Sequence, residues 1–230
     1  RVGSRARAVS LHAHSSRARR EAVLEALRQG GNVALITDAG TPAVSDPGAE
    51  LVALAHGSGA PVVSVPGPSA VAAALSVSGL PADRYLFLGF LPRKGPSRRD
   101  LVEQLAACEW TTVVFEAGNR LVDTLDQLAA ACEEGRRAAV ARELTKVHEE
   151  ARTGTLAELA GYYREHPPRG EVTVVVGGRA HTPLPVEAGD ARERARHLLA
   201  AGLTRRDAAD RLAGELGLSR NRAYALVTNL

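Results

Sequence analysis

The sequence contains no methionine, one isoleucine, two lysines and two cysteines among its 230 residues. Cys108 and Cys132 are too few for a disulfide scaffold and lack the spacing of a zinc site, so we expect an intracellular protein without a metal centre. Because translation starts with methionine, we expect that residues precede Arg1. With so few lysines, 27 of the 29 basic residues are arginines, a bias that indicates a GC-rich genome more than a function.

Long hydrophobic runs are also missing. No apolar stretch approaches the roughly 20 residues of a membrane-spanning helix, and no secretory leader is visible, so we expect a cytoplasmic protein without a membrane segment. A content of 45% hydrophobic and 24% charged residues is typical of globular chains and excludes a mainly disordered one. The net charge of +3 mildly favours an anionic partner.

Helix-like and strand-like segments alternate along the chain, which predicts an α/β fold. Continuous apolar runs, typical of strands buried on both faces, stand at 33–36 and 61–65, after a weakly strand-like segment at 8–11. Further strands are expected at 85–91, 111–115, 138–142 and 171–176. Helices are expected at 16–29, 46–56, 69–77, 97–108, 121–133, 155–165, 190–201, 204–216 and 219–230.

These segments predict two α/β domains, at 1–82 and 83–179, followed by a linker and a helical tail at 180–230. Asp46 with Pro47 is typical of a helix start, and Ser97 and Thr155 each precede an acidic residue by three positions, as in a capping box.

Two glycine- and proline-rich loops follow the first two predicted strands. Ligands of α/β sheets bind at the carboxyl ends of strands, where Asp38 accepts hydrogen bonds from a hydroxyl or an ammonium group. In the second loop, 65–70, Gly67 allows close approach of a ligand to the backbone. A helix-capping loop and an ordinary Pro-Gly-Pro turn are the alternatives. Neither a phosphate-binding P-loop nor a dinucleotide fingerprint is present.

Charged loops follow two later strands, at 116–120 and 141–149. The second contains a carboxylate, a hydroxyl and the lysine Lys146, and a solvated connection is the alternative for both loops. His12 and His14 share one face of a strand but have no third ligand nearby, so we expect no metal site.

The order of these motifs resembles the tetrapyrrole methylase superfamily, in its branch of ribosomal small-subunit RNA methyltransferase I enzymes. The resemblance covers about residues 8–178 and rests on segments 37–42, 45–48, 65–70, 88–95, 115–121, 142–149 and 170–172. It implies two α/β domains, S-adenosylmethionine (SAM) in the cleft between them, and a homodimer. The implied reaction is methylation of a cytidine ribose 2′-hydroxyl in 16S ribosomal RNA, either free or in the assembled small subunit.

The resemblance also implies the site. SAM is expected to contact Asp38, Ala39, Gly40, Thr41, Ser45, Asp46, Pro66, Gly67, Pro68, Ser69, Ala70 and Gly177. A ribose hydroxyl is weakly acidic, so a general base helps; Glu143 is the first candidate and Glu116 the second. Lys146 is expected to stabilise developing alkoxide charge or to hold a phosphate.

Arginines are the expected RNA contacts, because guanidinium groups pair with phosphate in a bidentate fork. The candidates are Arg17, Arg19, Arg20, Arg93, Lys94, Arg98, Arg99, Arg120, Arg220 and Arg222. The tail has the length of a helix-turn-helix, with Gly217 at the turn. Solvated helix faces and simple packing of a helical hairpin are the alternatives.

One departure from the family is large. Family members begin with a strand, a Pro-Ile-Gly-Asn loop and a Glu-Asp-Thr-Arg segment, and this sequence begins after them. If those residues are absent, we expect loss of one wall of the SAM site, an exposed sheet edge and an inactive fragment. Two other functions stay open: methylation of a precorrin-type tetrapyrrole, and non-enzymatic nucleic-acid binding by the tail.

Overall fold

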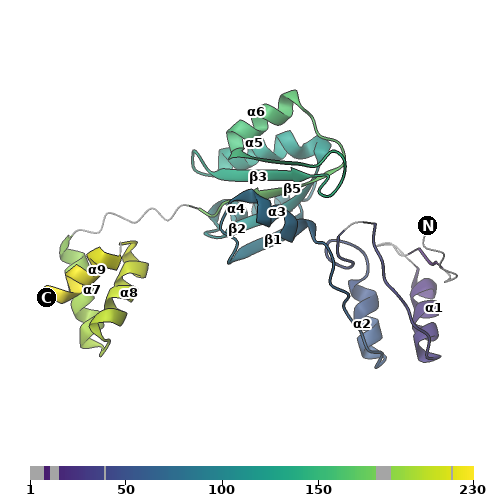
Figure 1. The fold of residues 1–230 in the computed structure, drawn as a ribbon, viewed down its shortest axis with the longest axis horizontal. Helices are drawn as coiled ribbons and strands as arrows, with labels where there is room; N and C mark the ends of the chain where they lie inside the picture. Colours follow the sequence, from purple (N-terminus) through teal and green to yellow (C-terminus); the bar gives the residue numbers. More distant parts are fainter. Residues whose placement is uncertain (1–7, 11–15, 39, 180–187, 219) are drawn as a thin grey trace. The chain divides into compact units, whose positions relative to one another are not determined.

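A computed structural model describes residues 8–10, 16–38, 40–179, 188–218 and 220–230. It divides into two compact units, Arg1–Gly178 and Arg179–Leu230 (Figure 1). Within the described ranges, no helix combines the length and the apolar character that a bilayer crossing requires.

The first unit is built around a five-stranded sheet with the order β1-β2-β5-β3-β4. Its strands are β1 (Tyr85–Phe90), β2 (Thr111–Ala117), β3 (Arg137–Arg142), β4 (Glu150–Thr155) and β5 (Glu171–Val176). β1 runs parallel to β2, whereas β5 is antiparallel to both β2 and β3, and β4 is antiparallel to β3. The α/β class is confirmed, and so are the four strands that were predicted between residues 85 and 176.

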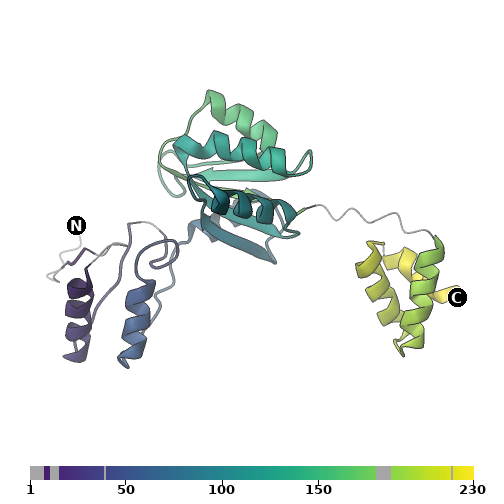
Figure 2. The same cartoon turned by 180° about the vertical axis from the view of Figure 1, so that it is seen from behind.

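Helices cover both faces of this sheet. The helices α4 (Pro96–Ala107), α5 (Leu121–Ala131) and α6 (Leu156–Glu165) pack on one face, and α3 (Ala70–Ser78) packs on the other (Figures 1 and 2). Neighbouring valines show the division: Val114 and Val174 contribute to the first core, and Val113 and Val175 to the second. Apolar side chains on alternate positions of a strand produce this two-sided burial.

Two capping predictions have different outcomes. Thr155 and Glu158 form the expected capping box of α6, with both reciprocal hydrogen bonds present. The helix α4 begins at Pro96 with Gly95 as its N-cap, so the prediction of Ser97 as the cap was wrong. Proline is suited to the first turn because its fixed φ is helical and it has no N–H to leave unpaired.

The edge strand β4 was not predicted. Its sequence contains Glu150, Arg152 and four small or hydroxylated residues, so it lacks the apolar alternation that marks a strand. Charged side chains are typical of edge strands, where they discourage pairing with another chain.

Two predicted strands in the first half are not formed. Segments 33–36 and 61–65 have no strand assignment, and Ile36, Val63 and Val65 are each more than 80% exposed. A strand exists only through ladder hydrogen bonds, and no described segment pairs with either run. The weak strand at 8–11 is likewise absent in 8–10, and its last residue lies outside the described ranges.

Helices of the first half are confirmed more closely. The structure has α1 at Arg17–Arg28, α2 at Ala49–Gly57 and α3 at Ala70–Ser78. Asp46 does not cap α2, which begins three residues later with Gly48 as N-cap. The carboxylate of Asp46 accepts a hydrogen bond from Thr37 instead.

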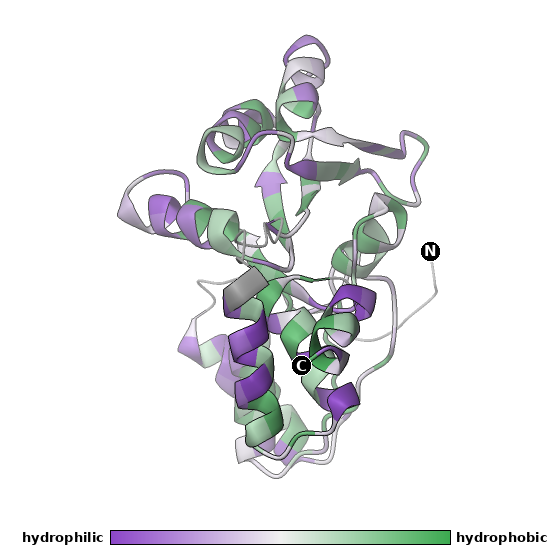
Figure 3. Ribbon diagram, turned by 90° about the vertical axis from the view of Figure 1, so that its left-hand side faces the viewer, coloured by the Kyte–Doolittle hydropathy of each residue, from purple (hydrophilic) through white to green (hydrophobic). Residues whose placement is uncertain are grey.

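The second unit consists of α7 (Ala188–Ala200), α8 (Arg205–Leu216) and α9 (Arg220–Thr228). Ala195, Leu212, Ala223 and Val227 are almost fully buried in its core. Figure 3 shows hydrophilic and hydrophobic residues alternating around these helices, as amphipathic packing requires. Thr204 caps α8, which begins where a helix was predicted, and Gly217 ends it in the left-handed conformation.

Candidate functional site

Three motif loops meet at one edge of the sheet. They are 91–95 after β1, 116–120 at the carboxyl end of β2 and 143–149 after β3. The three preceding strands run in the same direction, because β1 is parallel to β2, and both β2 and β3 are antiparallel to β5. The carboxyl ends of β1, β2 and β3 therefore lie along the same edge, as expected for a ligand site in an α/β fold.

Residues 170–172 lie between the two charged loops and contact both. Glu116 and Arg142 lie abreast on either side of Val172 in β5. The amide of Gly118 donates to the carbonyl of Gly170 at 2.7 Å. A Cβ added to Gly170 would stand 3.9 Å from Glu143 Oε1. Gly118, through its amide, and Glu143, through its side chain, thus both lie beside Gly170.

The 143–149 loop is held in an unusual backbone conformation. Glu143 and Thr145 have φ values of 50° and 68°. The Lys146 amide donates to the Glu143 carbonyl at 2.9 Å, and Lys146 Nζ lies 2.9 Å from Glu143 Oε1. Left-handed backbone at a β-branched threonine costs energy and tends to occur at functional sites.

The 38–48 loop also contains non-glycine residues in left-handed backbone conformations. Within the described part of the chain, the non-glycine residues with positive φ are Ala43, Ser45, Glu143 and Thr145. All four lie in the two loops that sequence patterns singled out. Thr37 Oγ1 donates to Asp46 Oδ2 at 2.7 Å and closes the first loop. Asp38 is exposed, and the candidate Ala39 lies outside the described residues.

The two candidate SAM loops contact each other. Thr41 Oγ1 donates to the carbonyl of Pro68 at 3.3 Å. Pro66, Gly67 and Pro68 are exposed, and Ser69 caps α3 by accepting a hydrogen bond from the amide of Ala72. Space is open beside the glycines: a Cβ on Gly40 would meet nothing within 4 Å, and one on Gly67 only the Val65 carbonyl at 3.9 Å. A ligand can therefore approach the backbone of both loops.

Gly89, in β1, lies against the 38–48 loop and was not predicted as a site residue. It interrupts the register between β1 and β2, with φ of 66°. A Cβ there would stand 3.1 Å from Ser45 Oγ. A glycine inside an apolar strand is the signal for such a close approach, and it was present in the sequence.

Gly177 does not join the other candidates. It follows β5, whose carboxyl end pairs with the first residues of β2 and β3, at the opposite edge of the sheet. Its amide donates to Arg137 at 2.8 Å, and its carbonyl accepts from Arg136 at 2.8 Å. These bonds hold the end of β5 against the start of β3.

Glu116 has a different environment from Glu143. The Glu116 side chain is fully buried and bonded to Arg98, Arg120 and Thr124, whereas the Glu143 side chain is 28% exposed. A substrate hydroxyl can reach Glu143 without rearrangement of the core. The arrangement favours a structural role for Glu116 over proton transfer.

The RNA-contact candidates differ in exposure. Arg98 is buried and Arg120 is three-quarters buried, so most of each side chain is turned away from solvent. Arg17, Arg93, Lys94, Arg99 and Arg222 are exposed. Arg19 donates to the Ser10 carbonyl, Arg20 pairs with Glu50 at 3.2 Å, and Arg220 pairs with Asp210 at 2.6 Å.

Two cavities are lined by basic residues. The first, of 310 Å³, is formed by Arg93, Lys94, Gly95, Pro96, Arg98, Arg99 and Gln127. The second, of 610 Å³, lies on the helical unit between α8 and α9 and is lined by Arg206, Asp210, Arg220, Asn221, Tyr224, Ala225, Thr228 and Asn229.

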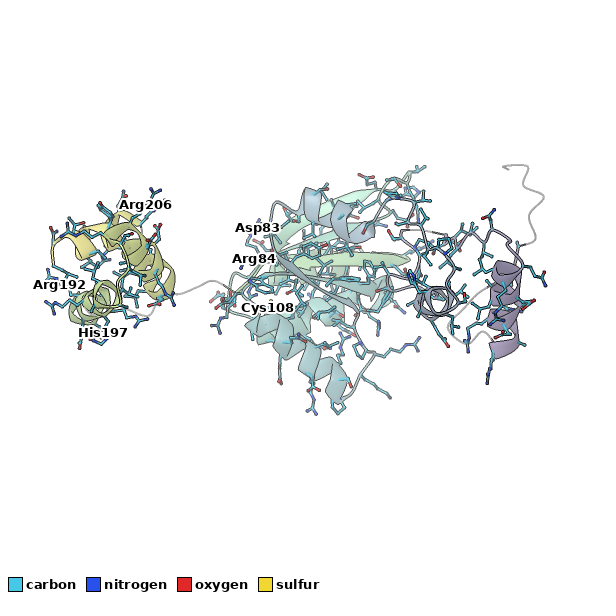
Figure 4. All side chains as sticks on the ribbon, turned by 90° about the horizontal axis from the view of Figure 1, so that it is seen from below. Asp83, Arg84, Cys108, Arg192, His197 and Arg206 are labelled. Atoms are coloured by element: carbon cyan, nitrogen blue, oxygen red, sulfur yellow. The ribbon has the colours of Figure 1, made fainter. Side chains whose placement is uncertain are left out.

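Charge is unevenly distributed between the two units. Residues 179–230 contain nine arginines and six acidic residues, whereas 1–178 contain twenty of each sign. The whole net charge of +3 therefore belongs to the helical unit. Figure 4 shows Arg192, His197 and Arg206 on its outer surface.

Comparison with known proteins agrees with this geometry. The family model of tetrapyrrole (corrin/porphyrin) methylases matches residues 2–160. The chain is 41% identical over 223 residues to a ribosomal RNA small subunit methyltransferase I of Synechocystis, covering 96% of this chain and 80% of that protein. The protein of the same name from Mycobacterium tuberculosis strain H37Rv is 42% identical over 218 residues, covering 93% and 73%.

Solved structures show the same fold. A cobalt precorrin-4 methyltransferase aligns with a TM-score of 0.54 at 20% identity over 72% of each chain. A uroporphyrin-III-C-methyltransferase from Thermus thermophilus aligns with a TM-score of 0.52 at 22% identity over 70% of each chain. The chain therefore belongs to the tetrapyrrole methylase family, in the branch of the ribosomal RNA small subunit methyltransferase I proteins.

Proposed function

We propose that this protein transfers the methyl group of SAM to a cytidine ribose 2′-hydroxyl in small-subunit ribosomal RNA. One observation carries the proposal: the basic loop 91–95 and the charged loops 116–120 and 143–149 meet at one sheet edge. This edge combines a carboxylate, an ammonium group and exposed cations, which suit a hydroxyl on an anionic polymer. The relatives named as ribosomal RNA methyltransferases support the substrate class.

The two N-terminal loops fit SAM as cofactor. Thr41 bonds to Pro68, so 38–48 and 66–70 form one surface, and Gly40 and Gly67 leave their backbone open to a ligand. We assign binding to Asp38, Gly40, Thr41, Ser45, Asp46 and 66–70, with Asp38 facing the ammonium of the methionine part. When bound, SAM supplies a methyl group on a sulfonium that is ready for in-line displacement.

Glu143 is the proposed general base. Its carboxylate would accept the proton of the ribose 2′-hydroxyl as the C–O bond forms and the methyl–sulfonium bond breaks. The products would be a methyl ether, a neutral thioether as leaving group and a protonated carboxyl group. Lys146, whose Nζ is 2.9 Å from Glu143 Oε1, stabilises the developing negative charge on the ribose oxygen. Alignment of the reacting atoms contributes about 7–11 kcal/mol of the barrier reduction in such reactions.

RNA binding is assigned to exposed cations of both units. Arg93, Lys94 and Arg99 face the first basic cavity, and Arg220 and Arg222 belong to α9 of the helical unit. We also propose a homodimer in the cytoplasm, where small subunits are available, on the basis of the family resemblance. The helical unit is a third proposed domain, after 1–82 and 83–179.

Transfer of labelled methyl from SAM tests the function. Assembled small subunits, free ribosomal RNA and a precorrin-type tetrapyrrole are offered in parallel to the gene product with its natural start. We expect label in RNA, at a ribose 2′-oxygen. Label in the tetrapyrrole alone would assign the protein to tetrapyrrole methylation. RNA binding without SAM binding, measured by calorimetry, would assign it to a non-enzymatic binding module.

A further inference from the structure

A fully buried carboxylate connects two of the motif loops. Glu116, with 0% of its side chain exposed, accepts hydrogen bonds from Thr124 Oγ1 at 2.7 Å and from the Ala117 amide at 2.8 Å. It also forms ion pairs with Arg98, at 3.4 Å, and with Arg120. Both carboxylate oxygens are therefore occupied by protein groups.

Both arginines extend from Glu116 to the backbone of the basic loop. Arg98 Nη1 donates to the Pro92 carbonyl at 2.9 Å, and Arg120 Nη2 donates to the Leu91 carbonyl at 3.3 Å. Leu91 and Pro92 directly precede Arg93. The buried carboxylate thus fixes the position at which the exposed cations of the loop begin.

This arrangement is costly as a way to fill a core. Burying charged groups costs desolvation free energy, and their mutual attraction offsets that cost only when the hydrogen bonds are well formed. The Arg98 guanidinium is well paired, since it also donates to Thr124 at 2.7 Å and to Gln127 at 2.9 Å. The Arg120 guanidinium is only partly paired, because its buried Nε and Nη1 atoms have no hydrogen-bond partner. A group retained at such a cost indicates a requirement beyond packing.

The 91–95 loop forms one wall of a basic cavity. Arg93, Lys94 and Arg99 line the 310 Å³ space together with Gln127, and the first two belong to the loop itself. Their exposure and charge fit a phosphodiester group of an RNA backbone. Their placement relative to one another depends on the backbone that Arg98 and Arg120 hold.

We propose that Glu116 is a positioning residue for RNA binding, which acts through Arg98 and Arg120 to hold Arg93 and Lys94 against an RNA phosphate. This role rests on the proposed function for its ligand. Glu116 touches neither the RNA nor the reacting atoms.

A local digestion experiment tests the positioning without RNA. Trypsin cleaves after Arg93 and Lys94 when the loop opens, and cleavage after the exposed Lys146 is the internal reference. We expect Glu116→Gln to accelerate cleavage at 93 and 94 relative to 146. Glu150→Gln is the matched control, because Glu150 also pairs with two arginines, Arg142 and Arg152, but lies on β4, at the other end of the strand order from β1 and the 91–95 loop. Equal acceleration in the control would overturn the proposal.

A double-mutant cycle tests the consequence for RNA. Free small-subunit ribosomal RNA is the probe, and binding is measured for Glu116→Gln, for the pair Arg93→Ala and Lys94→Ala, and for the triple variant. We expect Glu116→Gln to weaken RNA binding about tenfold in the native background and to have no effect once the two cations are removed. SAM affinity and kcat are expected to stay unchanged, with the loss confined to KM for RNA.

The opposite results are equally distinct. An equal loss of RNA affinity in both backgrounds would show that Glu116 acts elsewhere and would overturn the proposal. If Glu116→Gln does not fold, Thr124→Val removes one arm of the same cluster and is interpreted in the same way. If the unaltered protein does not bind RNA, the proposed function fails, and the trypsin experiment still decides whether Glu116 positions the loop.

Discussion

Lys146 Nζ lies 2.9 Å from Glu143 Oε1, in a loop where Glu143 and Thr145 both have left-handed backbone conformations. The carbonyl of Glu143 also accepts a hydrogen bond from the amide of Lys146. Side chains and backbone together therefore fix the carboxylate and the ammonium group as one unit, partly exposed at the sheet edge.

Replacing Glu143 by glutamine removes the proposed base while keeping the shape of the side chain. We expect single-turnover methylation to fall about 10²–10⁴-fold, the usual contribution of general-base catalysis. SAM affinity, measured by calorimetry, is expected to stay the same. Glu165→Gln, at the exposed end of α6, is the control. An unchanged methylation rate in Glu143→Gln would remove Glu143 from the mechanism.

Thr145→Gly tests whether the strain of the loop serves catalysis. Left-handed backbone costs a non-glycine residue about 1–2 kcal/mol, which glycine relieves, while the glycine adds flexibility to the unfolded chain. We expect the free energy of unfolding to change by less than about 1 kcal/mol and kcat to fall because Glu143 is less well held. A large loss of stability with normal kcat would contradict this assignment.

Removal of 179–230 tests the helical unit as an RNA contact. This unit carries the whole net charge of +3, so its loss is expected to weaken RNA binding and to reduce the salt dependence of the affinity. The slope should fall by about 0.7–0.9 for each lost phosphate contact. Binding is measured between low and moderate salt. An unchanged slope would show that the three helices pack without touching RNA.

The stability of the helical unit is expected to fall in acid. Hydrogen bonds from Arg194 and then Arg211 lower the pKa of Glu215 to about 2, below its ordinary value of 4.5. Because the folded-state pKa is depressed, this stabilisation is present above pH 4.5 and is lost as the pH falls toward 2. Amide exchange in α8 of the unaltered protein and of Glu215→Gln, compared at each pH, measures the difference.

That difference should be largest near neutral pH and should shrink between pH 4.5 and 2. Glu193→Gln, a change of another exposed acidic residue on α7, is the control. A difference that persists at pH 2 would show that Glu215 contributes through packing rather than through its charge.

The fold class, the helices and the motif loops could be predicted from local sequence patterns. Apolar periodicity and caps such as Thr155 and Thr204 act over a few residues, so they can be recognised without tertiary information. The order of the motifs was also sufficient to indicate the family. Even the strained loops were singled out, since glycine, proline and charge stand where predicted strands end.

Which of these residues lie together depends on the folded structure and could not be predicted from local patterns. The burial of Glu116 and Arg98 and the placement of Gly177 at the far edge depend on strand pairing across the sheet, which joins residues far apart in sequence. The same reason explains the errors at 33–36 and 61–65. Their apolar character favours a strand, but a strand also needs hydrogen-bond partners, which a local pattern does not supply.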